Sequence, residues 1–152
     1  MTRTELWSFL ETRAVEVRDA CARQWRVASD DTRRLQDHLQ RLEGLYLEYG
    51  QRQRAAQSQD HQVTQTSALR HTLSQLLSLQ ERVGRELSAA QAHEAQCRQR
   101  LDRAEAEVLK ARTVAERAVA DARRQEERTQ QRQMDAASVQ RHWLARLGSS
   151  EA

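Results

Sequence analysis

One set of side chains in the sequence could bind a metal ion. His93 and Cys97 are four residues apart, a spacing that places two ligands on one face of a helix. Cys21 could supply a third zinc ligand if the two halves of the chain fold against each other. No residue offers an obvious fourth ligand, and cysteine also packs as a small apolar residue between helices. We therefore expect no metal site and no cofactor.

No other pattern in the sequence indicates catalysis. The four glycines are isolated from one another, so no glycine-rich loop is available to hold a phosphate group. Acidic residues are numerous, but they are predicted to lie on hydrated helix faces, which do not provide the buried environment that acid–base catalysis uses. We expect that the chain is not an enzyme, and that it acts by binding other proteins.

The elements that must carry these residues are long helices. Of the 152 residues, 38% are hydrophobic and 4% are aromatic, which is too few for an ordinary globular core. Ala, Leu, Arg, Gln and Glu dominate and proline is absent, so the composition favours helices with few interruptions. Long helices need partners against which they bury their apolar faces.

A seven-residue repeat predicts that these partners are two halves of the same chain. The repeat positions are Trp7, Ala14, Cys21, Ala28, Leu35, Leu42 and Tyr49, and then Leu69, Leu76, Val83, Ala90, Cys97, Ala104, Ala111 and Ala118. Such heptads are typical of coiled coils. We predict an all-α fold with one domain over residues 1–152. It is an antiparallel coiled-coil hairpin of two long helices, at about 4–49 and 68–147, with an overhanging C-terminal helix.

The expected connection between the helices is the polar stretch of residues 50–67, which opens with Gly50, a residue suited to a helix C-terminus. Folding near residue 58 places Leu10 opposite Val108 and Cys21 opposite Cys97. Nearer the connection, the apolar pattern of the first helix shifts from Leu10 and Val17 to Trp25, Leu39 and Tyr46. This shift predicts a stutter around residues 29–32 that changes the register by three residues.

Charge and hydropathy limit the possible partners. The formal charge is +3 and the isoelectric point is about 9.4, but the arginines alternate with glutamates, so we expect no nucleic-acid partner. No stretch approaches the roughly 20 apolar residues that span a bilayer, and no signal peptide is evident. The seam of each predicted helix, meaning its stripe of apolar repeat positions, is narrow, which also argues against a helix lying on a membrane surface. We expect a cytoplasmic protein without direct membrane insertion.

Two segments resemble the flagellar FliJ family. Residues 21–53 are similar to the first helix of that family, with Leu42 paired to Tyr49 and with Glu48 before Tyr49. Residues 131–135, followed by Gln140 and Arg141, resemble its C-terminal basic segment. The resemblance extends over nearly the whole chain in length and in heptad layout.

The resemblance implies a non-catalytic stalk in the flagellar type III export apparatus. Its partners would be the hexameric export ATPase and its regulator, the cytoplasmic domain of the export gate, and substrate chaperones. Its place would be the cytoplasmic face of the inner membrane. The expected gate contacts are Leu42, Leu45, Tyr49 and Leu76, and the expected contacts with the ATPase ring are Arg123, Arg132, Met134 and Asp135.

Several alternatives stay open at this point. Leu45, Leu47, Leu77 and Leu79 fall beside the seam and form either a docking patch or part of a broader seam. The overhang is either a binding element or a solvated tail. The whole chain is alternatively the stalk of a virulence-associated secretion ATPase, or a generic coiled-coil protein that provides structure or dimerisation.

Overall fold

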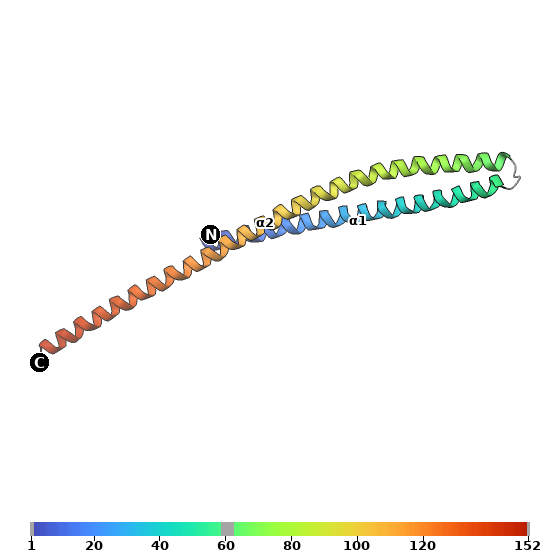
Figure 1. Ribbon diagram of the computed structural model, residues 1–152. Coiled ribbons are helices and arrows are strands. Elements are labelled where there is room, and N and C mark those ends of the chain that lie inside the picture. The colour runs from blue at the N-terminus through green and yellow to red at the C-terminus, as the bar shows by residue number, and fades with distance from the viewer. Residues whose placement is uncertain (1, 59–62, 152) are drawn as a thin grey trace. The chain divides into compact units, whose positions relative to one another are not determined.

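The computed structural model describes residues 2–58 and 63–151, and these residues form two helices (Figure 1). Helix α1 spans Arg3–Ser58 and helix α2 spans Val63–Ser150. The described residues contain no strand. The predicted all-α architecture of two long helices is therefore confirmed.

The end of α1 lies later in the sequence than predicted, and the start of α2 lies earlier. α1 continues through Gly50 to Ser58, and α2 begins at Val63, so the predicted inner ends at about 49 and about 68 are wrong, whereas the outer ends at about 4 and about 147 lie within three residues of the observed ones. No described glycine has a positive φ, so Gly50 does not act as a helix cap. The Gln, Arg and Ala residues after it are good helix formers and offset its cost of about 1 kcal/mol. Residues 59–62 of the predicted connection lie outside the described residues.

A capping box fixes the start of α1. The hydroxyl oxygen of Thr2 accepts a hydrogen bond from the backbone N–H of Glu5 at 3.2 Å, and the Glu5 carboxylate accepts one from the Thr2 N–H at 3.0 Å. Two backbone donors that the first helical turn would leave without partners are thereby satisfied. α1 thus begins at a position that its own side chains specify.

The chain divides into two compact units. We call residues 18–104 the hairpin unit, and the residues up to 17 together with those from 105 onwards the terminal unit. In the hairpin unit, Leu42, Leu76 and Val83 form a buried apolar cluster. Leu35, Leu39, Tyr46 and Tyr49 pack against this cluster. The cluster joins α1 to α2 near the connection.

The seam of the hairpin unit keeps one register. Buried or half-buried residues on α1 alternate at spacings of three and four: Arg18, Cys21, Trp25, Ala28, Thr32, Leu35, Leu39 and Leu42. Thr32 is buried, and its hydroxyl donates a hydrogen bond of 3.1 Å to the carbonyl of Ala28. Arg98 of α2 lies over the Trp25 ring, 5.2 Å from its centroid. The alternation passes through residues 29–32 without interruption, so the predicted stutter is wrong. The predicted pairing of Cys21 with Cys97 is wrong as well, because the contact of Arg98 with Trp25 places Cys97 in the layer of Trp25.

The terminal unit shows why the apolar pattern was misleading. The half-buried positions on α1 are Thr4, Trp7, Glu11 and Ala14, with Val15 beside them, whereas the side chains of Leu10 and Val17 are 39% and 52% exposed. Glu11 is stabilised at the seam because its carboxylate lies 3.2 Å from Nε of Arg112 on α2. Trp7 and Ala14, two positions of the seven-residue repeat, determine which face of α1 is turned toward α2, and Glu11 lies between them on that face. The ion pair of Glu11 with Arg112 therefore replaces the apolar contact that was expected for Leu10.

Candidate docking surfaces

The residues predicted to contact the export gate fall into two groups in the hairpin unit. Leu42 and Leu76 are 6% and 8% exposed and belong to the apolar cluster. Leu45 is 41% exposed, and Tyr49 is half-buried. Leu42, Leu45 and Tyr49 have the i, i+3, i+7 spacing of one helix face. Leu45 and Tyr49 are thus accessible to another protein, whereas Leu42 and Leu76 support the helices beneath them.

Tyr49 is held in place by a neighbouring arginine. The Arg52 guanidinium lies 5.1 Å from the centroid of the Tyr49 ring, and one of its nitrogens lies 2.8 Å from Oε1 of Glu48. A guanidinium over an aromatic face is a favourable cation–π contact. Together, these contacts restrict the tyrosine side chain at the surface.

The sequence left open whether four leucines, including Leu45, form a docking patch or part of a broad seam. Leu45, Leu47, Leu77 and Leu79 are all more than 40% exposed, so none of them lies inside the seam. Leu79 also lines a shallow groove with Ser74, Gln75 and Ser78. The hairpin unit therefore displays more apolar side chains near the connection than its own packing uses.

The second candidate surface is the overhang of α2, residues 121–150 of the terminal unit (Figure 1). Every residue in it is exposed except Ala137, which is half-buried. Met134 is 67% exposed and Trp143 is 60% exposed. Arg123, Arg132 and Asp135 are exposed as well, and Asp135 accepts a hydrogen bond of 3.2 Å from the Gln131 amide. All four predicted ring contacts are thus accessible on one helix.

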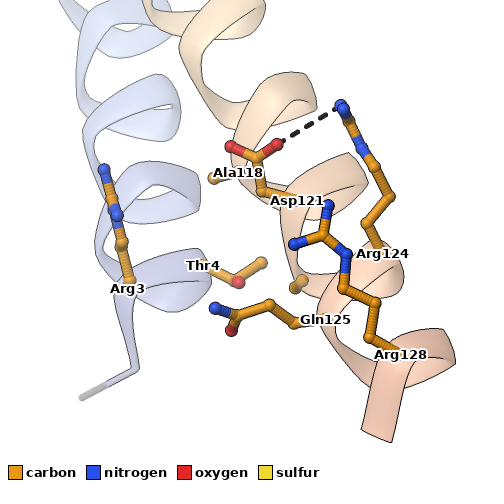
Figure 2. Close-up of a pocket in the computed structure, with 8 residues that line it drawn as sticks. Arg3, Thr4, Ala118, Asp121, Arg124, Gln125 and Arg128 are labelled. Carbon is orange, nitrogen blue, oxygen red and sulfur yellow. Dashed lines mark ion pairs between the residues drawn. The ribbon is translucent and has the colours of Figure 1, made fainter. Parts of the chain in front are cut away.

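A basic groove lies where α1 begins beside α2, within the terminal unit. Figure 2 shows Thr4 on α1 pointing toward a row of α2 side chains, whereas the side chain of Arg3 runs along α1. The α2 residues that line the groove are Ala118, Asp121, Ala122, Arg124, Gln125 and Arg128. Arg124 pairs with Asp121 at 3.3 Å. No sequence pattern identifies this groove, because Arg3 lies more than a hundred residues before Arg124 and Arg128 in the sequence.

A second groove in the terminal unit includes one of the predicted ring contacts. Arg123 lines it together with Glu116, Val119 and Ala120 of α2 and with Thr4, Ser8 and Glu11 of α1. Arg123 thus lies beside the start of α1, whereas Arg132, Met134 and Asp135 lie farther along the overhang.

The side chains considered as metal ligands lie in the hairpin unit. Sγ of Cys97 is 3.6 Å from Nε2 of His93, and both Cys21 and Cys97 are free thiols. Cys97 is 2% exposed at the seam, whereas His93 is exposed. Within residues 2–58 and 63–151, no group of three or more potential ligands is close enough to hold a metal ion.

Many coiled-coil proteins share this geometry, and comparison with known families shows to which family the chain belongs. The family model described as "Flagellar FliJ protein" matches residues 6–147. The chain belongs to the FliJ family. It is therefore a protein related to flagellar export. No curated protein and no solved structure matches the chain.

Membership of the FliJ family covers both units, because the match includes the start of α1 and almost all of the overhang. It also agrees with the resemblance found around Leu42, Tyr49 and Met134. In the described part of the chain, no helix is both long and apolar enough to cross a bilayer.

Proposed function

We propose that this FliJ-family protein is a non-catalytic stalk of the flagellar export ATPase. The terminal unit binds the ATPase hexamer and its regulator, and promotes ring assembly and ATP hydrolysis. The hairpin unit contacts the cytoplasmic domain of the export gate, and the protein also interacts with substrate chaperones. It works in the cytoplasm, at the inner face of the inner membrane. The family match supports the flagellar system over a related virulence apparatus.

The observation that carries this proposal is the exposed overhang of α2. A helix of this length is marginal in water unless it packs against another structure. Between residues 121 and 150 the chain itself provides almost no such packing. Exposed Met134, Val139, Trp143, Leu144 and Leu147 favour a protein partner over a solvated tail.

The gate contact is proposed for the exposed face around Leu45 and Tyr49. Aromatic residues that are held in place are frequent anchors of interfaces, and Tyr49 is held by Arg52. Leu42 and Leu76 act from beneath, because they fix the two helices that present this face. The four predicted gate residues thus have two roles, contact and support.

Co-purification with the export ATPase tests the proposal. We expect the full chain to be retained by the ATPase, and the combined variant Arg123→Gln, Arg132→Gln and Asp135→Asn to be retained less. A matched control is Arg82→Gln with Arg100→Gln and Asp37→Asn, which changes exposed charges of the hairpin unit instead. Equal retention of both variants would remove the ring contact from the overhang, and no retention of the full chain would remove the ATPase as a partner.

A further inference from the structure

Two grooves mark the two sides of the seam between α1 and α2 in the terminal unit. Arg3 of α1 and Arg124 of α2 line the first groove (Figure 2). Ser8 of α1 and Glu116 of α2 line the second, and Thr4, which lies at the seam, lines both. A residue seven positions farther along a coiled-coil helix returns to the same side of the seam. The lining residues therefore show on which side each row of side chains lies.

The row of α1 that begins at Arg3 carries three exposed apolar residues. Leu10 and Val17 follow Arg3 at intervals of seven residues, and Leu6 lies one turn before Leu10 on the same face. Leu6, Leu10 and Val17 are 44%, 39% and 52% exposed. Together with Arg13, they follow the alternation of four and three residues that is typical of a coiled-coil seam. α1 thus has a second seam, beside the one that packs on α2, and α2 does not cover it.

The row of α2 that ends at Arg124 is basic. Lys110 and Arg117 precede Arg124 at intervals of seven residues, and all three side chains are exposed. Glu107 pairs with Lys110 at 3.2 Å, and Asp121 pairs with Arg124 at 3.3 Å. Exposed ion pairs of this kind contribute little to stability, so they do not keep the two cations from other carboxylates. Among the described residues, no ion pair involves Arg117.

We propose that an amphipathic, acidic helix of another protein docks on this side of the terminal unit. We call the docking surface the basic flank, and it consists of Leu6, Leu10 and Val17 of α1 and Lys110, Arg117 and Arg124 of α2. The partner helix packs apolar residues against the α1 row and presents carboxylates to the α2 row. The three helices then form a coiled coil over about 21 Å, which corresponds to two heptads.

The spacing of the cations favours a helix as the partner. Carboxylates at every seventh position of a helix recur about every 10.5 Å, which matches the spacing of Lys110, Arg117 and Arg124. Side chains on one face of an extended strand recur about every 6.6 Å and do not stay in step with these cations. Complementary charges at the edges of coiled-coil helices also determine which helices pair. An apolar stripe with a row of carboxylates beside it therefore fits both rows of the basic flank.

The opposite side of the terminal unit has a different composition. Its α2 row runs through Leu109, Glu116 and Arg123, so one acid and one base replace the three cations. Its α1 row runs from Ser8 to Val15, which is half-buried. The two sides of the same helix pair thus differ in charge and in exposed apolar surface, and the opposite side supplies a control for the basic flank.

This inference goes beyond the proposed function. The ring contacts of that proposal are Arg123, Arg132, Met134 and Asp135, and none of them belongs to the basic flank. Docking of an acidic helix therefore does not depend on whether the overhang binds the ATPase.

Binding of a synthetic acidic helix to the full chain tests the charge of the flank. The probe is a fluorescent peptide of about three heptads, with leucine at the seam positions and glutamate at every seventh flanking position. Fluorescence anisotropy measures its Kd, and Lys110→Gln with Arg117→Gln should raise this Kd on the order of tenfold. Arg141→Gln with Arg146→Gln is the matched control, because it removes the same charge from exposed positions outside the flank. A probe that does not bind, that binds equally with lysine in place of glutamate, or that responds equally to both variants would overturn the proposal.

A second pair of variants tests the apolar half of the flank. Leu10→Ala with Val17→Ala should also raise the Kd of the acidic peptide on the order of tenfold, because it removes two of the apolar contacts. Leu109→Ala is the control, because Leu109 is 62% exposed on the opposite side. Circular dichroism should show that both variants stay helical. If Leu109→Ala weakens binding as much as the flank variant does, the peptide does not dock on the basic flank.

Thiol labelling locates the occupant without relying on affinities. In a chain with Cys21→Ala and Cys97→Ala, the acidic peptide should slow the labelling of Leu6→Cys and leave that of Leu109→Cys unchanged. Protection of Leu6→Cys by vesicles of anionic phosphatidylglycerol, but not by the peptide, would show a membrane-binding surface and contradict the proposal. Protection that rises with the concentration of the chain alone would assign the flank to a second copy and would contradict it as well. None of these measurements contains the ATPase, so their failure differs from a failure of ATPase binding.

Discussion

The side-chain amide of Gln80 on α2 donates a hydrogen bond of 3.1 Å to the backbone carbonyl of Leu42 on α1. Leu42 itself belongs to the buried cluster with Leu76 and Val83. A polar residue at a coiled-coil seam typically specifies the register at a cost in stability. Gln80 thus identifies which turn of α2 faces Leu42 in the hairpin unit.

Replacing Gln80 with leucine should stabilise the fold and loosen its register. We expect Gln80→Leu to raise the free energy of unfolding by about 1 kcal/mol, because the gain in apolar burial exceeds the loss of one hydrogen bond. Urea denaturation followed by circular dichroism measures the change. Gln75→Leu, at an exposed position of the same helix, should have little effect. A clear loss of stability in Gln80→Leu would show that the hydrogen bond mainly stabilises the fold.

The seam of the terminal unit can be tested with two alanine substitutions. Val108 is 3% exposed, so Val108→Ala should lower the free energy of unfolding by about 2 kcal/mol through lost burial and a residual cavity. Leu10 is 39% exposed although it is the larger residue, and Leu10→Ala should cost less than about 1 kcal/mol. If Leu10→Ala proves the more damaging variant, then Leu10 and not Glu11 occupies the seam.

The two cysteines provide a test of the antiparallel arrangement. Cys97 is buried and Cys21 is half-buried, both at seam positions of the hairpin unit. The contacts of Arg98 with Trp25 and of Gln80 with Leu42 place Cys97 in the layer of Trp25, about one helical turn from Cys21. Mild oxidation should therefore leave Cys21 and Cys97 unlinked within one chain.

In a Trp25→Cys chain, mild oxidation should link the introduced cysteine to Cys97, because a shared layer brings the two Cα atoms into the range of about 4.4–6.8 Å that a disulfide requires. Mass spectrometry after non-reducing separation identifies the product. Exclusively intermolecular disulfides would argue against a hairpin within one chain.

Tyr49 and Leu35 separate gate binding from stability. Both pack against the cluster of Leu42, Leu76 and Val83. We expect Tyr49→Ala to weaken binding to the export-gate cytoplasmic domain by roughly 1–4 kcal/mol, as for an aromatic anchor. Leu35→Ala should lower the melting temperature and leave the affinity for the gate unchanged. Calorimetric titration and thermal unfolding of both variants measure the two effects.

Gate docking by Tyr49 is contradicted if Tyr49→Ala and Leu35→Ala behave alike. If both variants lose similar stability and keep wild-type affinity, Tyr49 is an ordinary seam residue. A Leu45→Ala variant then provides the second comparison, because Leu45 is exposed and does not belong to the buried cluster. Unchanged affinity in Leu45→Ala as well would remove the docking face.

The fold class could be predicted from the sequence because its signal is long and periodic. Small or apolar residues at every seventh position specify two helices and the phase of their buried faces, and both appear in the structure. The end of α1 could not be predicted from Gly50. A glycine inside a good helical sequence costs too little to stop the helix.

The error at Leu10 has a different physical origin. Residue type alone favours Leu10 and Val17 for the seam, but the phase of a helix is common to all of its turns. The ion pair of Glu11 with Arg112 on α2 makes the polar position tolerable, and only a structure reveals that pair. The basic groove of Arg3, Arg124 and Arg128 was missed for the same reason, because it depends on contact between distant parts of the chain.

The most direct test of the proposed function is ATP hydrolysis by the export ATPase in the presence of the chain truncated after Ala122. The truncation removes Arg123, Arg132, Met134 and Asp135 together with the rest of the overhang, while leaving α1 and the seam partners Val108 and Ala115 in place. Circular dichroism should confirm that the remaining chain is helical. We predict that the full chain stimulates hydrolysis and ring assembly, and that the truncated chain stimulates neither. Full stimulation by the truncated chain would contradict the assignment of the overhang as the element that binds the ATPase.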